Sequence, residues 1–372
     1  MNIPLAKPYF SSEEEKNVLK VIRSGWIMQG KKVEELEILL ANYIGVKNAL
    51  LVSSGTAALH LALLSLGIGE GDEVIVPSFS FAATANCILY VGAKPVFVDI
   101  EKKTYNIDPL KIKDKISKRT KAIIAVHQIG LMADMPKILN VAKENNLTVI
   151  EDAACALGSK YKNKMAGTFG NIACFSFHPR KNITTGEGGL VTTNNKKIAE
   201  VLKSLRNHGL VKLGLKDRLL RLGYNFRMTD LQAAIGIAQF KKLKAVFKKR
   251  QSMVNIYNKV FTKYSELETP FVPKGYVHRY QSYMIRYKGS QKNRDFIIEK
   301  LKKEGIACRD SITAIHKEPL YRKMFPSLRL PETEKAQSQG IILPLYPQMS
   351  KKEQEFIIGR LEDVLKIIKK HG

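Results

Sequence analysis

The strongest constraint on the fold is an alternation of short apolar runs with helix-like segments between about residues 45 and 195. The apolar runs are rich in β-branched residues and nearly continuous, which is typical of strands buried on both faces. Amphipathic stretches separate most of them, so we expect a mostly parallel sheet with helices on both faces. The predicted strands are residues 49–53, 73–77, 95–99, 122–127, 148–152, 173–177 and 190–193, and the predicted helices are residues 56–66, 108–116 and 135–145.

The pattern changes after about residue 230. The elements expected there are a helix at 230–252, a strand at 281–287 and helices at 292–305 and 351–370. We therefore predict a large α/β domain over residues 1–250 and a smaller C-terminal α+β domain over residues 251–372. A length of 372 residues agrees with two domains.

The net charge of +27 is the unusual bulk property of this chain. Nucleic-acid binding is one interpretation, because lysine and arginine neutralise phosphates. The basic residues are scattered through helix-like segments, without a basic tail or an aromatic-studded groove, which favours a lysine-rich solvated surface. A positive field that attracts an anionic small substrate also fits. We expect no nucleic-acid partner.

No stretch approaches the roughly 18 uninterrupted apolar residues of a membrane-spanning helix, and the first residues carry no signal-peptide pattern. We therefore expect a cytoplasmic protein without a membrane partner. The four cysteines, at positions 87, 155, 174 and 308, stand far apart and form no C-x-x-C pair. Neither a metal site nor a disulfide framework is expected from this spacing.

Residues 53–60, S-S-G-T-A-A-L-H, are the first segment that could carry chemistry, because they follow a predicted strand and open a predicted helix. Exposed backbone N–H groups and the helix dipole attract an anion at such a turn, where Gly55 allows close approach and Thr56 adds a donor. The alternative is a simple helix cap. The segment is neither a Walker A loop nor a dinucleotide-binding fingerprint.

Two further segments place a carboxylate and an amine at strand ends. Asp152 ends the strand predicted at 148–152, where ligands sit in open α/β sheets, and its carboxylate could keep a heterocyclic nitrogen protonated. Lys181 follows the strand predicted at 173–177 and precedes G-E-G-G at 186–189, a setting in which partial burial gives a nucleophilic amine. Taken singly, Asp152 could cap a helix and Lys181 could lie on the surface.

Together, the three segments supply an anion cradle, a carboxylate and an amine at one edge of the sheet. This is the set that a pyridoxal-phosphate (PLP) site needs, namely a phosphate holder, a partner for the pyridine nitrogen and a lysine that forms a Schiff base. Phe81 offers an aromatic ring to stack on the cofactor, although it could equally belong to the core. The sequence therefore predicts a PLP enzyme whose cofactor is carried by Lys181.

Six motifs in a fixed order identify a resemblance that runs nearly end to end. They are S-G-W-I at 24–27, the segment 53–61, G-D-E-V-I-V-P at 71–77, E-D-A-A at 151–154, the segment 175–189 and G-Y-N-F-R-M-T-D at 223–230. The chain resembles the DegT/StrS-type family of PLP-dependent nucleotide-sugar aminotransferases. This resemblance implies the aspartate-aminotransferase (type I) fold for the large domain.

The resemblance also implies roles for single residues. Lys181 matches the lysine that forms the Schiff base, and Asp152 matches the partner of the pyridinium nitrogen. Phe81 matches the residue that stacks on the ring, and Cys155 lies where many relatives carry Gln or His near the cofactor hydroxyl. The residues that match phosphate contacts are Gly55, Thr56 and Ser176. Some relatives carry His in place of the lysine and act as dehydratases, which Lys181 speaks against.

Asn225 resembles a phosphate ligand that the neighbouring subunit donates, which implies a homodimer with shared active sites. His316 falls where relatives place a sugar-site histidine, and Trp26 and Gln29 lie in a segment that resembles the substrate-facing loop. For these three substrate-binding candidates, ordinary packing or surface exposure is the alternative.

By this resemblance, the reaction consists of two half-reactions. L-glutamate gives its amino group to the cofactor, which becomes pyridoxamine phosphate, and the amine then passes to the ketone of a nucleotide-linked 4-keto-6-deoxysugar. Lys181 moves the proton and Asp152 keeps the ring nitrogen protonated. The wording of residues 177–187 looks more like that of C4-transaminating members than of C3 ones. The product would serve amino-sugar synthesis for surface polysaccharides.

Three alternatives remain from the sequence. One is a PLP enzyme of the same fold with other chemistry, such as dehydration. Another is an aminotransferase for a C3-keto sugar or a keto-cyclitol. The third, from a different class, is a basic DNA-binding regulator on a degenerate enzyme scaffold, which the pairing of Asp152 with Lys181 disfavours.

Overall fold

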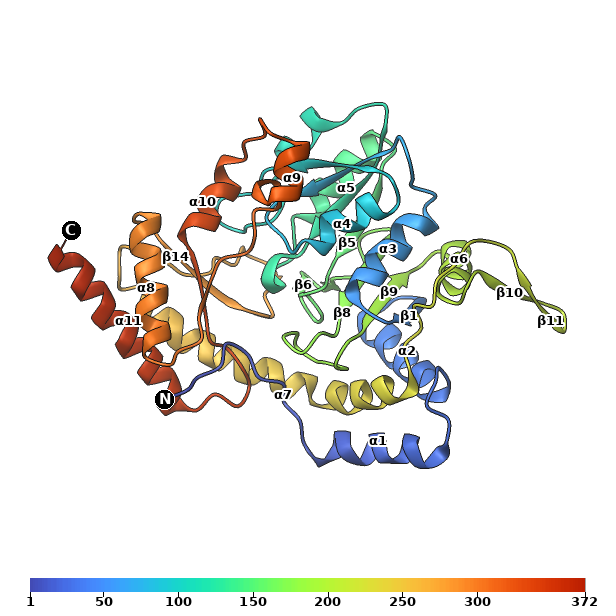
Figure 1. The fold of residues 1–372 in the computed structure, drawn as a ribbon, viewed down its shortest axis with the longest axis horizontal. Helices are drawn as coiled ribbons and strands as arrows, with labels where there is room; N and C mark the ends of the chain where they lie inside the picture. The colour runs from blue at the N-terminus through green and yellow to red at the C-terminus, as the bar shows by residue number, and fades with distance from the viewer. Residues whose placement is uncertain (372) are drawn as a thin grey trace.

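A seven-stranded sheet lies at the centre of the protein in the computed structural model, which describes residues 1–371 (Figure 1). Its strands are β1 (Asn48–Val52), β2 (Glu73–Pro77), β3 (Lys94–Val98), β4 (Thr120–Val126), β5 (Thr148–Asp152), β8 (Ile172–Ser176) and β9 (Gly189–Thr193). In space they follow the order β1-β9-β8-β5-β4-β2-β3. The neighbouring pairs from β8 to β3 are parallel, whereas β9 runs antiparallel to both β1 and β8.

Helices cover both faces of this sheet, because successive side chains of a strand point to opposite sides. On β1, Leu51 packs into one hydrophobic cluster, whereas Leu50 and Val52 pack into another. The helices over the first cluster are α2 (Lys31–Ile44), α5 (Met135–Glu144) and the first part of α7 (Asp230–Phe261), and those over the second are α3 (Gly55–Ser65), α4 (Ala83–Tyr90) and α6 (Lys196–Arg206). The predicted fold class is confirmed.

A second, smaller sheet packs on the last turns of α7 (Figure 1). Its strands are β12 (Leu267–Glu268), β14 (Tyr283–Tyr287), β15 (Arg309–Asp310) and β16 (Gly340–Leu343), and its other helices are α8 (Gln291–Lys303) and α11 (Lys351–His371). The strands pair antiparallel in the order β12-β14-β16-β15. The rings of Tyr257 and Phe261 from α7 stack in this core with centroids 5.4 Å apart.

Shorter elements complete the fold. They are α1 (Ser12–Ser24), β6 (Lys160–Tyr161), β7 (Lys164–Met165), β10 (Leu210–Leu213), β11 (Lys216–Leu219), β13 (Tyr276–Val277), α9 (Pro319–Met324), α10 (Pro331–Gln339) and the 3-10 turns η1 (Pro109–Lys111), η2 (Lys113–Lys115), η3 (Gln128–Gly130) and η4 (Ile315–Lys317). Helix α1 lies along α7, and the β10–β11 hairpin projects from the body beyond α6 (Figure 1). Consistent with this projection, all four residues of β11 are exposed.

The predicted strands agree closely with the sheet. The predictions at 73–77 and 148–152 coincide with β2 and β5, and the other five are displaced by one or two residues. Central strands are easy to locate because both of their faces are buried, so an uninterrupted apolar run marks them.

Two predicted helices need correction. The helix predicted at 108–116 is wrong, because η1 and η2 occupy this segment. Its backbone N–H groups bond to the carbonyl three residues back, as Lys111 does to Asp108 at 3.1 Å and Lys115 to Ile112 at 3.0 Å, which is the 3-10 pattern. The helix predicted to end at 252 continues to Phe261, because its last turns bury apolar side chains in the second core.

Part of the predicted C-terminal domain packs on the large sheet. Tyr321 and Leu330 belong to the hydrophobic cluster under α3 and α4. Asp99, at the end of β3, accepts hydrogen bonds from the backbone N–H groups of Glu332 and Thr333 at the start of α10, at 3.1 and 2.9 Å. The predicted boundary at residue 250 falls inside α7 and stays a prediction.

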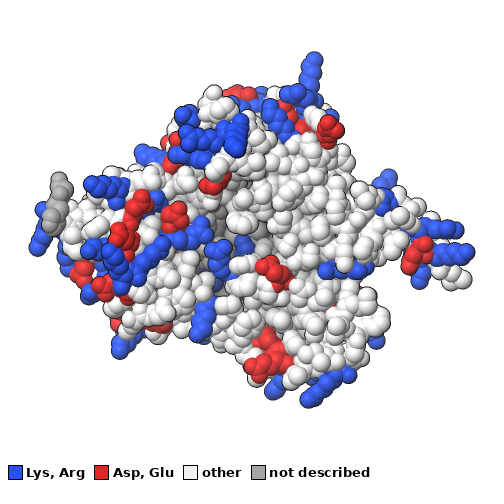
Figure 2. Space-filling view, in the orientation of Figure 1, with Lys and Arg blue, Asp and Glu red and all other residues white. Residues whose placement is uncertain are grey.

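Lysine and arginine side chains are dispersed over the visible surface (Figure 2). They are densest over the second sheet with α8 and α11, which we call the small domain, and on the projecting hairpin, and a broad area with few charges lies between these two regions. Across residues 1–371, no helix combines the length and the apolar character needed to cross a membrane.

We predict that His278 makes the fold sensitive to acid. Burial lowers the pKa of His278 from 6.5 to about 3, so the folded protein keeps this side chain neutral. The unfolded chain takes up the proton near pH 6.5, so the unfolding free energy falls as the pH drops from 6.5 towards 3, by at most about 1.4 kcal/mol per pH unit. Urea unfolding at several pH values should show a flatter dependence for His278→Asn. Equal slopes in the two proteins would contradict this assignment.

Candidate active site

A cavity of about 370 Å³ opens at the carboxyl ends of β4, β5 and β8. Parallel α/β sheets place ligands at this edge, because the loops that leave the strand ends surround a common space. Residues of the small domain, including Gln281, Arg309 and Leu343, line the opposite side. The cavity therefore lies between the two parts of the chain.

The first turn of α3 forms one end of the cavity, where Ser54, Gly55 and Thr56 are exposed to it. The Ser54 hydroxyl caps the helix by accepting a hydrogen bond from the Ala57 N–H at 3.1 Å. A Cβ atom at Gly55 would lie 2.8 Å from the Cβ of Ser176, so only glycine fits here. The first N–H groups of a helix have no intrahelical acceptor, so this close-packed turn presents donors to an anion.

Asp152 ends β5 and lines the cavity, although only 5% of the residue is exposed. Its Oδ2 accepts a hydrogen bond from the Thr84 hydroxyl at 2.8 Å, and its Oδ1 accepts one from the Ala154 N–H at 3.2 Å. An ionised carboxylate has about four acceptor positions, so Asp152 can still bind a protonated nitrogen.

Lys181 lies on the loop between β8 and β9, and its side chain reaches the same cavity. The amine donates a hydrogen bond to the Cys155 Sγ at 3.1 Å. The loop is fixed from two directions, because the Lys181 N–H donates to the His178 carbonyl at 2.8 Å and the Gln281 side chain donates to the Arg180 carbonyl at 2.8 Å. These contacts hold the backbone that carries Lys181, and the bond to Cys155 directs the amine.

Positive charge accumulates near this loop. Arg180 and Arg309 line the cavity together with Lys181. Burial and the neighbouring Arg180 and Lys181 cations lower the pKa of His178, although Glu187 opposes the shift. His178 is therefore neutral at physiological pH, and the cavity attracts anions through its lysine and arginines.

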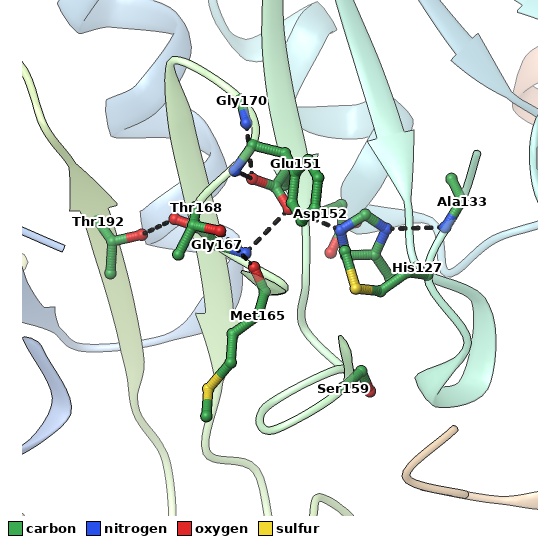
Figure 3. Close-up of polar contacts among 12 residues, drawn as sticks. His127, Ala133, Glu151, Asp152, Ser159, Met165, Gly167, Thr168, Gly170 and Thr192 are labelled. Atoms are coloured by element: carbon green, nitrogen blue, oxygen red, sulfur yellow. Dashed lines mark hydrogen bonds and ion pairs between the residues drawn. The ribbon is translucent and has the colours of Figure 1, made fainter. Parts of the chain in front are cut away.

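A buried network of hydrogen bonds around Glu151 supports the strand ends behind the cavity (Figure 3). The Glu151 carboxylate is fully buried and accepts hydrogen bonds from the N–H groups of Gly167, Phe169 and Gly170 at 2.7–2.9 Å. The His127 Nε2 lies 2.8 Å from the same carboxylate. Burial alone would raise the pKa of Glu151, but the hydrogen bonds from His127 and the backbone lower it below its usual range.

The tautomer of His127 follows from its second contact. The Ala133 N–H donates to the His127 Nδ1 at 3.2 Å, so the ring proton sits on Nε2 and is donated to Glu151. The His127 N–H also donates to the carbonyl of Asp152 at 3.0 Å. Glu151 and His127 therefore hold the ends of β4 and β5 in place beside the cavity.

The structure brings most of the predicted site residues together. Those that line the cavity are Gly55, Thr56, Phe81, Asp152, Cys155, Ser176 and Lys181. They come from four separate segments, which agrees with the prediction that strand ends meet at one edge of the sheet.

Four other predicted site residues lie outside the cavity within the described part of the chain. His316 is buried, with its Nδ1 2.7 Å from the Ser78 hydroxyl and its Nε2 3.3 Å from Glu334. Trp26 is exposed and donates to the Gln29 carbonyl at 3.2 Å. Gln29 lines a separate surface hollow, and Asn225 pairs with Asn207 at the base of the hairpin. Their predicted roles in binding stay predictions.

Several cavity residues were not predicted from the sequence. They are Thr84, Gln128, His178, Arg180, Gln281 and Arg309. His127 and Glu151 were also overlooked as a pair, although both stand at predicted ends of neighbouring strands. The strand ends could have revealed that pair, whereas Gln281 and Arg309 reach the site only through the packing of the small domain. No group of three or more His, Cys, Asp or Glu within residues 1–371 is arranged to hold a metal ion.

Comparisons with known proteins agree with this geometry. Residues 8–362 match the DegT/DnrJ/EryC1/StrS aminotransferase family. The chain is 42% identical to the protein MJ1066 of Methanocaldococcus jannaschii and 37% identical to the spore coat polysaccharide biosynthesis protein SpsC of Bacillus subtilis, each over 98% of this chain and 97% of the relative. The structure of Spr1654 from Streptococcus pneumoniae, named as a sugar aminotransferase in its PMP form, superposes with a TM-score of 0.95 at 29% identity, covering 99% of this chain and 100% of that one.

Spr1654 has also been solved in a PLP form. The residues that line the cavity of the present chain fit this cofactor. The α3 turn, which a Cβ at Gly55 would fill, suits a phosphate. Asp152 suits a protonated ring nitrogen, and Lys181 supplies the amine. The three groups share one cavity, which is the arrangement that PLP requires.

We predict that Glu151→Gln lowers the free energy of unfolding by about 3 kcal/mol or more. The glutamine NH2 group would take the place of a carboxylate oxygen, so at least one of the N–H groups that donate to Glu151 would lose its acceptor. Glu187→Gln is the matched control, since the same change is made at an exposed position that also lines the cavity. Urea unfolding of both variants would test this prediction. A loss for Glu151→Gln no larger than that for Glu187→Gln would show that the network does not stabilise the fold.

Proposed function

Since this chain belongs to the DegT/DnrJ/EryC1/StrS aminotransferase family and its cofactor is PLP, we propose that it transfers the amino group of L-glutamate to C4 of a nucleotide-linked 4-keto-6-deoxysugar. The observation that carries the proposal is the convergence of Lys181, Asp152 and the α3 turn on one cavity. When bound, PLP supplies an electron-withdrawing ring that accepts the electrons of a broken C–H bond.

The residues of this chain would divide the work as follows. The N–H groups of the α3 turn bind the phosphate, and the Asp152 carboxylate holds a proton on the ring nitrogen. The amine of Lys181 reaches this cavity, so it would take up the proton from the Cα atom of the amino donor and deliver it to the C4′ atom of the cofactor. Phe81 lines the cavity and offers the face of its ring for stacking.

The positive charge of the cavity supports anionic substrates. Arg180 and Arg309 are available for the carboxylates of glutamate or for the phosphates of a nucleotide. The net charge of +27 adds a long-range attraction for a doubly phosphorylated sugar donor. SpsC is named for spore coat polysaccharide biosynthesis, which supports a place for this enzyme in amino-sugar synthesis for surface polysaccharides.

We predict that the purified protein converts nucleotide-linked 4-keto sugars to 4-amino sugars with L-glutamate as donor, as mass spectrometry of the product would show. Lys181→Ala should lower the rate by about a hundredfold or more, because a general base of this kind contributes that much. Lys181→Arg keeps the charge but cannot act as the base, so it should be equally impaired. A 3-keto sugar or keto-cyclitol as the preferred substrate would contradict the C4 assignment, and full activity in Lys181→Ala would contradict the role of Lys181.

We also propose a homodimer with shared active sites. The hairpin carries exposed leucines, with Leu215 fully exposed and Leu219 70% exposed, which a second copy would bury. The broad area with few charges, beside this hairpin, offers a surface for such contact (Figure 2). Asn225 lies at the base of the hairpin and outside its own cavity, so it is available to the partner's site.

Mixing two inactive variants would test the shared sites. Lys181→Ala and Asn225→Ala homodimers should each be impaired, because every site lacks one group. After subunit exchange, half of the dimers would be mixed, and each mixed dimer would hold one intact site, so about a quarter of the wild-type activity should return. A mixture that shows only the average of the two variants would contradict the proposal.

A further inference from the structure

The polar surroundings of Asp152 include two hydroxyl groups with no role assigned so far. The Thr84 Oγ1 on α4 lies 2.8 Å from the Asp152 Oδ2, and the Ser80 Oγ lies 2.7 Å from the same Thr84 oxygen. Thr84 is 1% exposed and Ser80 is 3% exposed, so neither hydroxyl can exchange its partner for water freely. Both residues line the cavity.

The direction of these hydrogen bonds follows from the charge of Asp152. An ionised carboxylate only accepts, so the Thr84 hydroxyl must donate its single proton to Asp152. The remaining lone pairs of the Thr84 oxygen then accept the proton of the Ser80 hydroxyl. The two hydroxyls therefore form a one-way relay from Ser80 through Thr84 to Asp152, in which each bond strengthens the next.

The two buried thiols near Asp152 carry no charge that would compete with its hydrogen bonds. Cys87 on α4 and Cys174 on β8 are the buried groups affected by the Asp152 charge. Burial, with the Asp152 charge adding to it, raises the pKa of both thiols well above their usual range, so they stay neutral. Among residues 1–371, Thr84 is the only side-chain donor to Asp152, and the Ala154 N–H is its backbone donor.

We propose that Thr84 is a positioning residue that, supported by Ser80, orients the Asp152 carboxylate towards the ring nitrogen of PLP. The inference rests on the role of Asp152 in the proposed function. A carboxylate that is already held in one orientation presents its free lone pairs to the ring nitrogen without first having to reorganise, which strengthens that hydrogen bond. Thr84 would thus act on the cofactor only through Asp152.

The test is a double-mutant cycle read out by PLP affinity. Thr84→Val keeps the shape of the side chain and removes the hydroxyl, whereas Thr84→Ser keeps the hydroxyl. We expect Thr84→Val to weaken PLP binding to the apo-protein by about tenfold or more, as loss of a hydrogen bond to a charged group would, and Thr84→Ser to stay within about twofold of wild type. Absorbance or fluorescence titration with PLP alone measures both constants, without any substrate.

The same pair of changes in an Asp152→Asn background decides the mechanism. If Thr84 acts through the carboxylate, Thr84→Val and Thr84→Ser should there differ by less than about twofold. An undiminished tenfold difference in that background would overturn the proposal, because the hydroxyl would then act independently of Asp152. Equal PLP affinity of Thr84→Val and wild type would overturn it as well.

Ser80→Ala provides a second measurement that does not disturb Thr84, and it covers the case in which Thr84→Val fails to fold. It removes the outer hydroxyl, so PLP affinity should fall by about two- to fivefold in the wild-type background and not in Asp152→Asn. No loss in Ser80→Ala would overturn the relay. If Asp152→Asn itself binds PLP as tightly as wild type, the role of Asp152 in the proposed function fails, which is distinct from a failure of Thr84 alone.

Discussion

Glu151 carries a negative charge in a place without access to water, and four hydrogen-bond donors from two segments converge on it. Three of the donors are backbone N–H groups of the loop before β8, and the fourth is His127 at the end of β4. A buried carboxylate is tolerated only when it is fully satisfied, so these segments must adopt their positions together. The next residue in the chain is Asp152, and its direction into the cavity depends on this anchor.

Strand ends were predictable because their signal is local. The strands that end at Asp152 and before Lys181 are uninterrupted apolar runs, which predict burial directly from the sequence. Parallel strands then bring their carboxyl ends to one edge of the sheet. Gly55 and Thr56 follow from the same rule, since they begin the helix after β1. The part of the site that was predicted therefore depends on short-range sequence patterns and on one general property of parallel sheets.

Other parts of the site depend on long-range packing that the sequence does not display. Thr84 reads as an ordinary residue of an apolar helix, and its contact with Asp152 exists only because α4 crosses the end of β5. Gln281 and Arg309 reach the cavity from the small domain, far along the chain. The helix predicted at 108–116 is wrong because helix propensity is a weak local signal, and this segment forms two 3-10 turns where it packs.

Helix α7 runs through both hydrophobic cores as one unbroken element of 32 residues. Near its middle, the buried Arg250 donates to the carbonyls of Tyr280, Gln281 and Leu345, so the helix also holds the segment that borders Lys181. If either core unfolded, apolar side chains of α7 would become exposed to water. The part of the helix that packs in the other core would then be destabilised as well. The two cores are therefore one thermodynamic unit, which melts in a single cooperative step rather than core by core.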